Sequence, residues 1–352
     1  MTLPLRSATT IVLHLISLIL LLIAREAEGL NIAITGTSQG IGLDAAKRLI
    51  RDGHTVYHAN RSIERSNIAV KESGGGTPMV CDLGDLRSIR KFATDLQQLQ
   101  PNLDVLCCNA GIAPSTKAEQ PKLTKDGFEE CIGVNHLGHF LLTNLLVDHL
   151  GKNSDNNGVL VVTASSVHDP EGPGGAVGGK GGATLGDLSG FGIRLNDDSE
   201  GNLATMPDGV LTYDGGKIYK DSKLCNVLFC REAYKKWGEK ISIRSLNPGF
   251  IPSSGLFRAP REDNWFGATA FTFVAGLVGF AVPIEVGGER LEYMIKSDDS
   301  EIPSGSYFSA DVGSKAATKA DGFNGDSGIS VEASNDDLAA SLWDLSVTTV
   351  GL

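Results

Sequence analysis

Tyr219 and Lys223 are the residues whose types and spacing point most directly to chemistry. They stand four positions apart, so on a helix they share one face. A free phenol has a pKa of about 10 and exchanges protons poorly at neutral pH, but a neighbouring ammonium stabilises the phenolate and lowers that pKa. The pair therefore predicts a proton-transfer group beside a lysine that can also hold a sugar hydroxyl.

Two further side chains are expected to serve this pair. Ser166 follows an expected strand and could donate a hydrogen bond to a substrate oxygen, with Ser165 as the alternative. Asn135, on an expected long helix, could anchor a water that relays protons to the lysine. The predicted catalytic residues are Tyr219, Lys223, Ser166 and Asn135.

A glycine-rich turn, TGTSQGIG, lies between the first expected strand and a helix. Gly36, Gly40 and Gly42 leave bare backbone that can approach a pyrophosphate, and the helix N-terminus favours its negative charge. The strand–turn–helix context makes this glycine spacing informative, because glycine-rich turns alone are common. The turn therefore predicts a dinucleotide site.

The ends of the next strands indicate which dinucleotide binds. Asn60-Arg61 closes the second strand without an acidic residue, which favours a 2′-phosphate and hence NADP(H). Asp82 is placed to contact the adenine amine, and Asn109-Ala110-Gly111 would lie along the cofactor. The remaining residues expected in the cofactor site, besides Tyr219 and Lys223, are Thr35, Ser38, Ile41, Leu83, Pro248 and Gly249.

The elements that would position these residues alternate between strand and helix. Strands are expected over residues 31–35, 55–59, 78–81, 103–108, 159–164 and 241–246, and helices over 41–52, 62–73, 86–99, 127–150, 219–237, 285–296 and 338–347. This alternation predicts an α/β fold, a doubly wound parallel sheet of Rossmann type, in one domain over residues 30–352.

Two segments interrupt that alternation. Residues 168–217 hold 14 of the 43 glycines and form a long insertion before the Tyr-Lys helix. Structureless segments of this length in compact domains are usually functional or disordered. Residues 255–285 are expected to form an apolar substrate lid, and Trp265–Pro283 within them carries no charge.

The composition limits the class of protein. A net charge of −11 argues against nucleic acid as a partner, because phosphate backbones are bound by basic surfaces. The six cysteines have no zinc spacing and are predicted to be core thiols, and no metal site is expected. Residues 1–29 are expected to be a signal peptide or signal anchor, because the apolar run Ile11–Ala24 is shorter than a membrane span.

Together these motifs resemble the short-chain dehydrogenase/reductase family across about residues 31–350. A closer likeness is to its light-dependent protochlorophyllide reductase branch, and it is carried by KIYKDSKLCN (217–226), Leu185-Gly186-Asp187-Leu188, Gly255-Leu256-Phe257-Arg258 and the ending from Trp343 to Leu352. The resemblance implies an NADPH-dependent reductase of a large planar tetrapyrrole, with a proton from or through Tyr219.

The resemblance also carries implications for the surroundings of the site. The insertion and the Trp265–Pro283 stretch would line the pigment pocket or touch a membrane, and the chain could form a homodimer through the helices bearing Asn135 and Tyr219.

The leader would direct the chain into the secretory pathway, and from there to a complex plastid or to an endomembrane.

The chain departs from this branch at Asn247-Pro248-Gly249-Phe250, where the light-dependent enzymes carry a tyrosine and a cysteine. Phe250 cannot donate a proton, and Asn247 restores the general family pattern. A dark carbonyl reductase or alcohol dehydrogenase for a retinoid-, steroid- or lipid-like substrate is therefore a second hypothesis. A non-catalytic NADP(H)-binding redox sensor is a third.

Overall fold

The computed structural model of the chain describes residues 29–151, 157–172, 174–175, 182–196, 204–257, 280–325 and 328–352. The expected leader lies outside the described residues except for Gly29, as do residues 258–279 of the expected lid and parts of the insertion. None of the helices in the described ranges is long and apolar enough to cross a membrane.

The centre of the fold is a seven-stranded parallel sheet in the order β3-β2-β1-β4-β5-β6-β7. The strands are β1 (Asn31–Thr35), β2 (Thr55–Asn60), β3 (Thr77–Val80), β4 (Val105–Cys108), β5 (Gly158–Thr163), β6 (Ile241–Leu246) and β7 (Ser306–Phe308). The strand order reverses between β1 and β4, and open α/β sheets bind ligands at such a point. The doubly wound sheet is confirmed; β7, only three residues long, was not foreseen.

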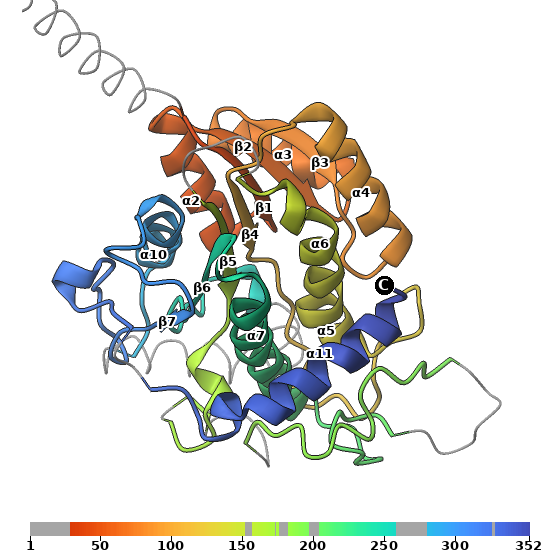
Figure 1. Cartoon of the computed structure of the whole chain (residues 1–352). Helices are drawn as coiled ribbons and strands as arrows, with labels where there is room; N and C mark the ends of the chain where they lie inside the picture. The colour runs from red at the N-terminus through yellow and green to blue at the C-terminus, as the bar shows by residue number, and fades with distance from the viewer. Residues whose placement is uncertain are drawn as a thin grey trace, which may run out of the picture.

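Helices cover both faces of the sheet (Figure 1). They are α2 (Gly40–Arg51), α3 (Ile63–Ser73), α4 (Leu86–Leu99), α5 (Glu130–Ile132), α6 (Gly138–Leu146), α7 (Gly215–Trp237), α10 (Ile284–Lys296) and α11 (Asp336–Val350). α2 and α10 pack together over one hydrophobic cluster, with α3 beside α2, while α4, α6 and α7 cover the other cluster.

The expected long helix over 127–150 begins later and is divided into segments. Gly127 has φ +88°, and the Thr124 amide donates to the Phe128 carbonyl at 2.8 Å, so the chain turns there before α5 begins at Glu130. A five-residue π-helical segment, Gly133–Leu137, then separates α5 from α6. Such segments occur often at functional sites.

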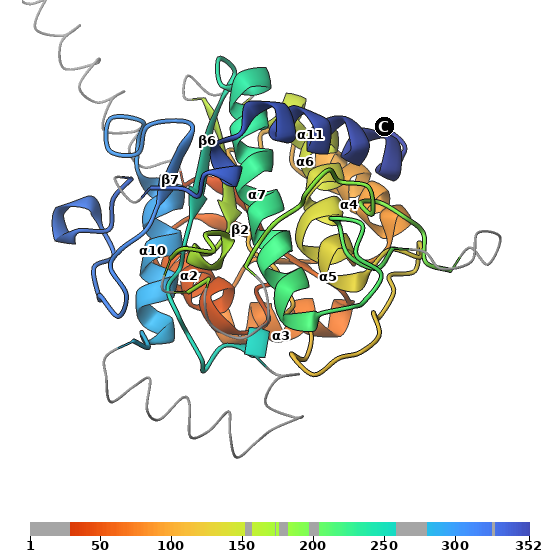
Figure 2. The same cartoon turned by 90° about the horizontal axis from the view of Figure 1, so that it is seen from below.

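The C-terminal helix α11 lies across α7 and reaches α6 (Figures 1 and 2). Its Trp343 stacks on Phe229 of α7, with ring centroids 5.8 Å apart, and meets Phe140 of α6 edge-on at 4.9 Å. These are the helices through which a dimer was expected, so pairing through the face that α11 covers would require α11 to move.

The insertion contributes to the core where it is described. Leu185, Leu188, Phe191 and Tyr213 are buried in the cluster on the α7 side. All six cysteines are buried free thiols, which confirms the prediction of core thiols. The insertion is therefore packed onto the domain along the helix that bears Tyr219.

Candidate active site

Tyr219 and Lys223 lie near the N-terminal end of α7. The helix begins at Gly215, earlier than expected, because Asp214 caps it: its Oδ1 accepts from the amides of Gly216 at 2.8 Å and Lys217 at 2.9 Å. Lys223 Nζ lies 5.7 Å from the centroid of the Tyr219 ring and donates to the Thr163 carbonyl of β5 at 3.1 Å. The structure thus brings the pair together at the carboxyl end of β5.

Burial controls the protonation of this pair. It raises the pKa of Tyr219, Cys131 raises it further, and a hydrogen bond with the Ser165 hydroxyl lowers it. The sequence predicted a lowered phenol pKa, whereas in the structure desolvation is the largest influence and shifts the pKa of Tyr219 upward. Burial lowers the pKa of Lys223 to about 8. At neutral pH the phenol is therefore protonated and can donate a proton.

Ser165 and Ser166 follow β5, and the structure distinguishes them. Ser165 makes the hydrogen bond to the Tyr219 phenol, and its carbonyl lies 2.7 Å from His168 Nδ1. Ser166 opens a single 3-10 turn, Ser166–His168, and a Cβ built on Gly174 of the insertion would lie 3.0 Å from its Oγ. Ser165 therefore faces the phenol, and Ser166 faces the insertion.

Asn135 is fully buried in the π-helical segment. Its Oδ1 accepts from the Ile112 amide at 2.9 Å, and its Nδ2 donates to the Ile112 carbonyl at 3.0 Å and to Ser222 Oγ at 2.9 Å. Ser222 in turn donates to the Tyr219 carbonyl at 2.7 Å. The side chain thus ties the segment after Gly111 to the Tyr-Lys helix, while its role in a proton relay stays a prediction.

His139 is a buried site residue that the sequence analysis missed. Its Nδ1 lies 3.1 Å from the Asn135 carbonyl, and its Nε2 lies 2.9 Å from Thr35 Oγ1. Burial lowers its pKa to about 4, so the ring is neutral at physiological pH. The available signal was its position four residues after Asn135. It connects the helix of Asn135 to the end of β1.

The glycine turn has the geometry of a phosphate cradle. Gly36 and Gly40 have φ of +75° and +63°, and a Cβ on Gly42 would lie 2.5 Å from the Gly36 carbonyl oxygen. The N-cap residue of α2, Gln39, makes no side-chain cap hydrogen bond to the helix, and the first amides of a helix are groups that can bind an anion. Ile41 is half-buried there, packing closely against α10.

The segment after β4 is joined to β1. Thr35 Oγ1 accepts from the Asn109 and Ala110 amides, both at 2.9 Å, and Asn109 Nδ2 donates to the Thr35 carbonyl at 2.9 Å. Asn109 Oδ1 is buried with no partner among the described residues, and a Cβ on Gly111 would lie 3.6 Å from Lys223 Nζ. An orphaned acceptor and a bare-backbone cradle are what a nicotinamide dinucleotide in this crevice would need.

Polar groups that could hold a 2′-phosphate lie at the end of β2. The buried Asn60 accepts from the Ser38 amide at 3.2 Å, and Arg61 next to it is exposed. Arg65, which sequence analysis missed, lies one turn into α3 and donates to Ser38 Oγ at 3.4 Å. Its signal was the spacing of four residues from Arg61. Arg61 and Ser38 were both expected in the cofactor site, and Arg65 adds a second arginine to them.

Asp82 and Leu83 follow β3. Asp82 Oδ2 pairs with Lys125 Nζ at 3.1 Å, and its Oδ1 accepts from the Gly84 amide at 3.2 Å. Leu83 is buried, and a Cβ on Gly138 would lie 2.5 Å from its carbonyl oxygen, so α6 packs closely on this loop. The contact of Asp82 with adenine stays a prediction.

Pro248 and Gly249 are held by Arg290, which the sequence analysis also missed. Arg290 is 1% exposed and donates to the carbonyls of Pro248 at 3.0 Å, Ser314 at 2.8 Å and Ala316 at 2.7 Å. Gly249 has φ +93° beside it. Burial lowers the pKa of Arg290 to about 10. The loop after β6 is therefore fixed by a buried guanidinium.

Comparison with known proteins agrees with this geometry. Residues 30–177 match the family model of short chain dehydrogenases. Protochlorophyllide reductase A, chloroplastic, of Oryza sativa subsp. japonica is 37% identical over 331 residues, 91% of this chain and 80% of that protein. The protochlorophyllide reductase of Avena sativa is also 37% identical, over 91% of this chain and 99% of its own length.

Solved structures share the fold. An uncharacterized protein from Mycobacterium paratuberculosis is 25% identical, with a TM-score of 0.61 over 91% of this chain and 93% of its own. A 3-ketoacyl-(acyl-carrier-protein) reductase from Brucella melitensis, complexed with NADH, is 17% identical, with a TM-score of 0.56 over 82% of this chain and 98% of its own.

The chain belongs to the short-chain dehydrogenase/reductase family. It is an oxidoreductase of the kind that works with a nicotinamide cofactor, and it is similar to the protochlorophyllide reductases of plants. The resemblance inferred from the motifs is thereby confirmed.

Proposed function

We propose that the protein is an NADPH-dependent reductase of a carbon–carbon double bond in protochlorophyllide or a closely similar tetrapyrrole. The observation that carries the proposal is the extent of the similarity. The general family model matches residues 30–177, whereas the similarity to the Oryza sativa enzyme extends over 331 residues. It therefore continues past the residues that the general family model matches, through the insertion and the C-terminal segments.

The proposed cofactor is NADPH. Arg61, Arg65 and Ser38 stand together at the end of β2, where an acidic residue would favour NAD. The residues proposed to line the cofactor are Thr35, Gly36, Ser38, Gly40, Ile41, Gly42, Arg61, Asp82, Leu83, Asn109, Ala110, Gly111, Tyr219, Lys223, Pro248 and Gly249.

The residues around Tyr219 suit proton delivery to a substrate carbon. When bound, the cofactor supplies the hydride. Tyr219 supplies the proton, because its raised pKa keeps the phenol protonated at neutral pH. Ser165 orients the phenol oxygen. Lys223, whose Nζ donates to the Thr163 carbonyl, would hold the ribose hydroxyls of the cofactor, and Asn135 would anchor the water that returns a proton. Ser166 is the proposed contact to the substrate, since it faces the insertion.

The test follows absorbance after mixing the protein with NADPH and protochlorophyllide, in darkness and under illumination. Formation of a chlorin is expected, and Tyr219→Phe is expected to lose turnover by about a hundredfold or more. Tyr234→Phe, an exposed tyrosine on the same helix, is the matched control. If the protein does not bind the pigment and forms no chlorin, the tetrapyrrole proposal is wrong. Full activity in Tyr219→Phe would show that the proton donor is misassigned.

A dark carbonyl reductase or alcohol dehydrogenase is the second candidate, and the loop after β6 favours it. Asn247 Nδ2 donates to Ser309 Oγ at 3.1 Å, and its Oδ1 accepts from the Gly249 amide at 3.2 Å, so this side chain supports the loop. Phe250 brings no proton donor to the position where the light-dependent branch has reactive groups. NADPH oxidation by a retinoid, steroid or lipid carbonyl in darkness, without any activity on protochlorophyllide, would favour this candidate.

The proposed compartment is a plastid, reached by way of an N-terminal signal. The Oryza sativa and Cucumis sativus relatives are named as chloroplastic, and six buried free thiols suit a reducing compartment. Expression of a fluorescent fusion in an alga with complex plastids tests this. Fluorescence restricted to the endoplasmic reticulum would instead support a signal anchor.

A further inference from the structure

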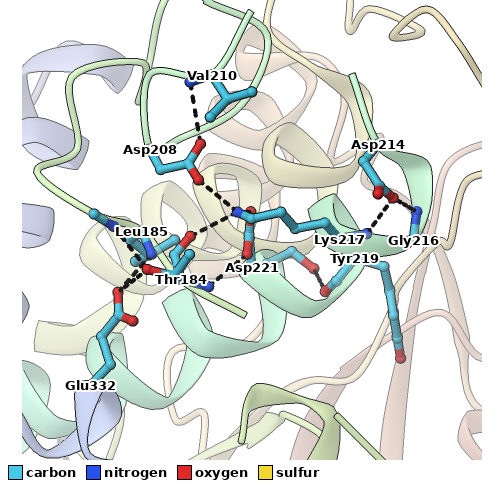
Figure 3. A network of polar contacts seen from close by, with 12 residues as sticks. Thr184, Leu185, Asp208, Val210, Asp214, Gly216, Lys217, Tyr219, Asp221 and Glu332 are labelled. Carbon is cyan, nitrogen blue, oxygen red and sulfur yellow. Dashed lines mark hydrogen bonds and ion pairs between the residues drawn. The ribbon is translucent and has the colours of Figure 1, made fainter. Parts of the chain in front are cut away.

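Helix α7 carries two charged or polar pairs of the same spacing on opposite sides. Tyr219 and Lys223 form one pair, and Lys217 and Asp221 form the other, offset by two residues. Two residues correspond to about 200° around a helix, so the second pair points away from the first. Figure 3 shows Lys217 and Asp221 directed at the insertion, while the Tyr219 ring leaves the helix on another side.

The second pair holds one turn of the insertion. Lys217 Nζ donates to Asp221 Oδ2 at 2.6 Å and to the Thr184 carbonyl at 3.0 Å, and it pairs with Asp208 Oδ2 at 3.1 Å. Asp221 Oδ1 accepts from the Thr184 amide at 3.0 Å. Lys217 and Asp221 thus hold both backbone polar groups of a single insertion residue.

Glu332, from the segment before α11, completes this arrangement (Figure 3). Its Oε1 accepts from the Leu185 amide at 2.6 Å and from Thr184 Oγ1 at 3.3 Å. We call Lys217, Asp221, Asp208 and Glu332 the insertion clamp. Three separate parts of the chain therefore converge on Thr184 and Leu185.

The clamped turn has a constrained backbone. Leu188, which closes the turn with a hydrogen bond from its amide to the Leu185 carbonyl at 3.0 Å, has φ +63° and a buried side chain. It is the one non-glycine residue with positive φ in the described ranges. A leucine adopts that conformation only when its surroundings enforce it. The clamp and the burial of the Leu188 side chain together enforce one path of the insertion.

Burying the charged side chains of the insertion clamp costs desolvation free energy. The Asp221 side chain is 0% exposed, and those of Lys217 and Asp208 are 13% and 12% exposed. Desolvation offsets most of the attraction in such a pair, so it adds little net stability, yet it strongly disfavours arrangements that leave one charge unpaired. The best-attested role of a buried ion pair is to fix the register of one chain segment against another.

The insertion also contacts the substrate side of the site. It leaves the fold just after Ser166 and returns to Asp214, the cap of α7. Lys220 Nζ, one residue beyond Tyr219, donates to the Gly175 carbonyl at 2.8 Å, and Gly174 lies against Ser166. Both limbs of the insertion are thus placed by residues that flank Tyr219.

We propose that Lys217 and Asp221 are positioning residues that fix the register of the insertion on the Tyr-Lys helix and thereby form the substrate side of the active site. The identity of the substrate in this proposal rests on the proposed function. The clamp itself does not, because its effect on the insertion can be measured without any substrate.

The first measurement is hydrogen–deuterium exchange of the peptide that contains the Thr184 and Leu185 amides. Lys217→Met and Asp221→Asn are expected to speed its exchange by about tenfold or more, since each removes a charge that holds the turn. Lys217→Arg keeps the charge and should retain protection. Lys91→Met is the matched control, because Lys91 and Asp95 form a pair of the same spacing at 2.7 Å on α4.

The second measurement is kinetic, with NADPH and protochlorophyllide. Lys217→Met is expected to raise KM for the pigment by about tenfold, with the Kd for NADPH and kcat within about twofold of wild type. If Asp221→Asn does not fold, the double variant Lys217→Met/Asp221→Leu, which leaves no unpaired charge in the pair, takes its place.

The outcomes separate the two proposals. Unchanged exchange in Lys217→Met and in the Asp221 variant overturns the clamp, whatever the substrate. Faster exchange with an unchanged KM overturns its role on the substrate side. If wild-type protein neither binds nor reduces protochlorophyllide, the proposed function fails, and the exchange measurement still decides whether the clamp exists.

Discussion

Glu129 offers the sharpest test of the electrostatics around the site. It is buried, its Oε2 accepts from the Ile132 amide at 2.7 Å, and its Oε1 accepts from the Tyr213 hydroxyl at 2.9 Å. Burial raises its pKa from 4.5 to about 7, although these hydrogen bonds act in the opposite direction. At any pH at which the Glu129 carboxylate is charged in the folded protein, that charge therefore lowers the free energy of unfolding.

The sign and size follow from linkage. The pKa of Glu129 is higher in the folded state than in the unfolded state. The contribution of Glu129 to the free energy of unfolding is therefore fully present below pH 4.5 and is lost as pH rises through about 7. A difference of about 2.5 pKa units corresponds to about 3 kcal/mol between the two limits. Between about pH 5 and about pH 8.5 the change is about 2.5 kcal/mol, because part of the range lies near the unfolded pKa.

Glu129→Gln keeps the shape and an acceptor while removing the titration. The free energy of unfolding is measured in urea at about pH 5 and about pH 8.5. The difference between variant and wild type is expected to shift by about 2.5 kcal/mol in favour of the variant from the lower pH to the higher one. Glu130→Gln, at the next position, controls for the change in net charge. If wild type and Glu129→Gln lose stability with pH in parallel, the carboxylate does not titrate as burial requires, and the reasoning is wrong.

Three further perturbations address other parts of the molecule. Arg65→Leu is expected to weaken NADPH binding by about tenfold and to leave NADH binding unchanged, measured by cofactor fluorescence; equal losses for both cofactors would place Arg65 outside a 2′-phosphate site. The rate of reduction, measured as kcat/KM, should fall as pH rises above about 8, because Lys223 loses its charge there; a rate still rising at that pH would contradict this. Trp343→Ala should cost about 3–5 kcal/mol of unfolding free energy in urea, whereas Leu345→Ala on the exposed face of α11 should cost far less; similar losses would show that α11 is not anchored by its tryptophan.

Much of the fold could be predicted because periodicity and turn residues agree with the final packing. β1 and α4 have the expected bounds, and the first six strands were all foreseen. β7 was missed because three residues carry too little pattern to register. The π-helical segment around Asn135 was missed because its side-chain pattern does not differ from that of an ordinary helix, whereas its backbone does: the Gly138 amide donates to the Gly133 carbonyl, five residues earlier.

The site residues also divide into those that local spacing marks and those that it does not. Tyr219, Lys223 and the glycine turn are marked by local spacing, which a sequence displays directly. Arg290 acts through contacts with residues distant along the chain, such as Pro248, so no local spacing identifies it, and His139 is marked only by its position four residues after Asn135. The Tyr219 pKa was misjudged for a related reason: the sequence shows a neighbouring ammonium but not the depth of burial.

The position of α11 has a consequence for how the protein is made. α11 comes after α6 and α7 in the chain, so during synthesis these helices emerge before the helix that covers them. Until Trp343 arrives, Phe140 and Phe229, which contact each other, lack the indole ring that packs against both of them in the folded protein. Exposed apolar surface of this kind makes a folding intermediate prone to aggregation. Newly made chains are therefore the form most dependent on chaperones, and destabilising changes in α11 should lower the soluble yield more than they lower the activity of the protein that does fold.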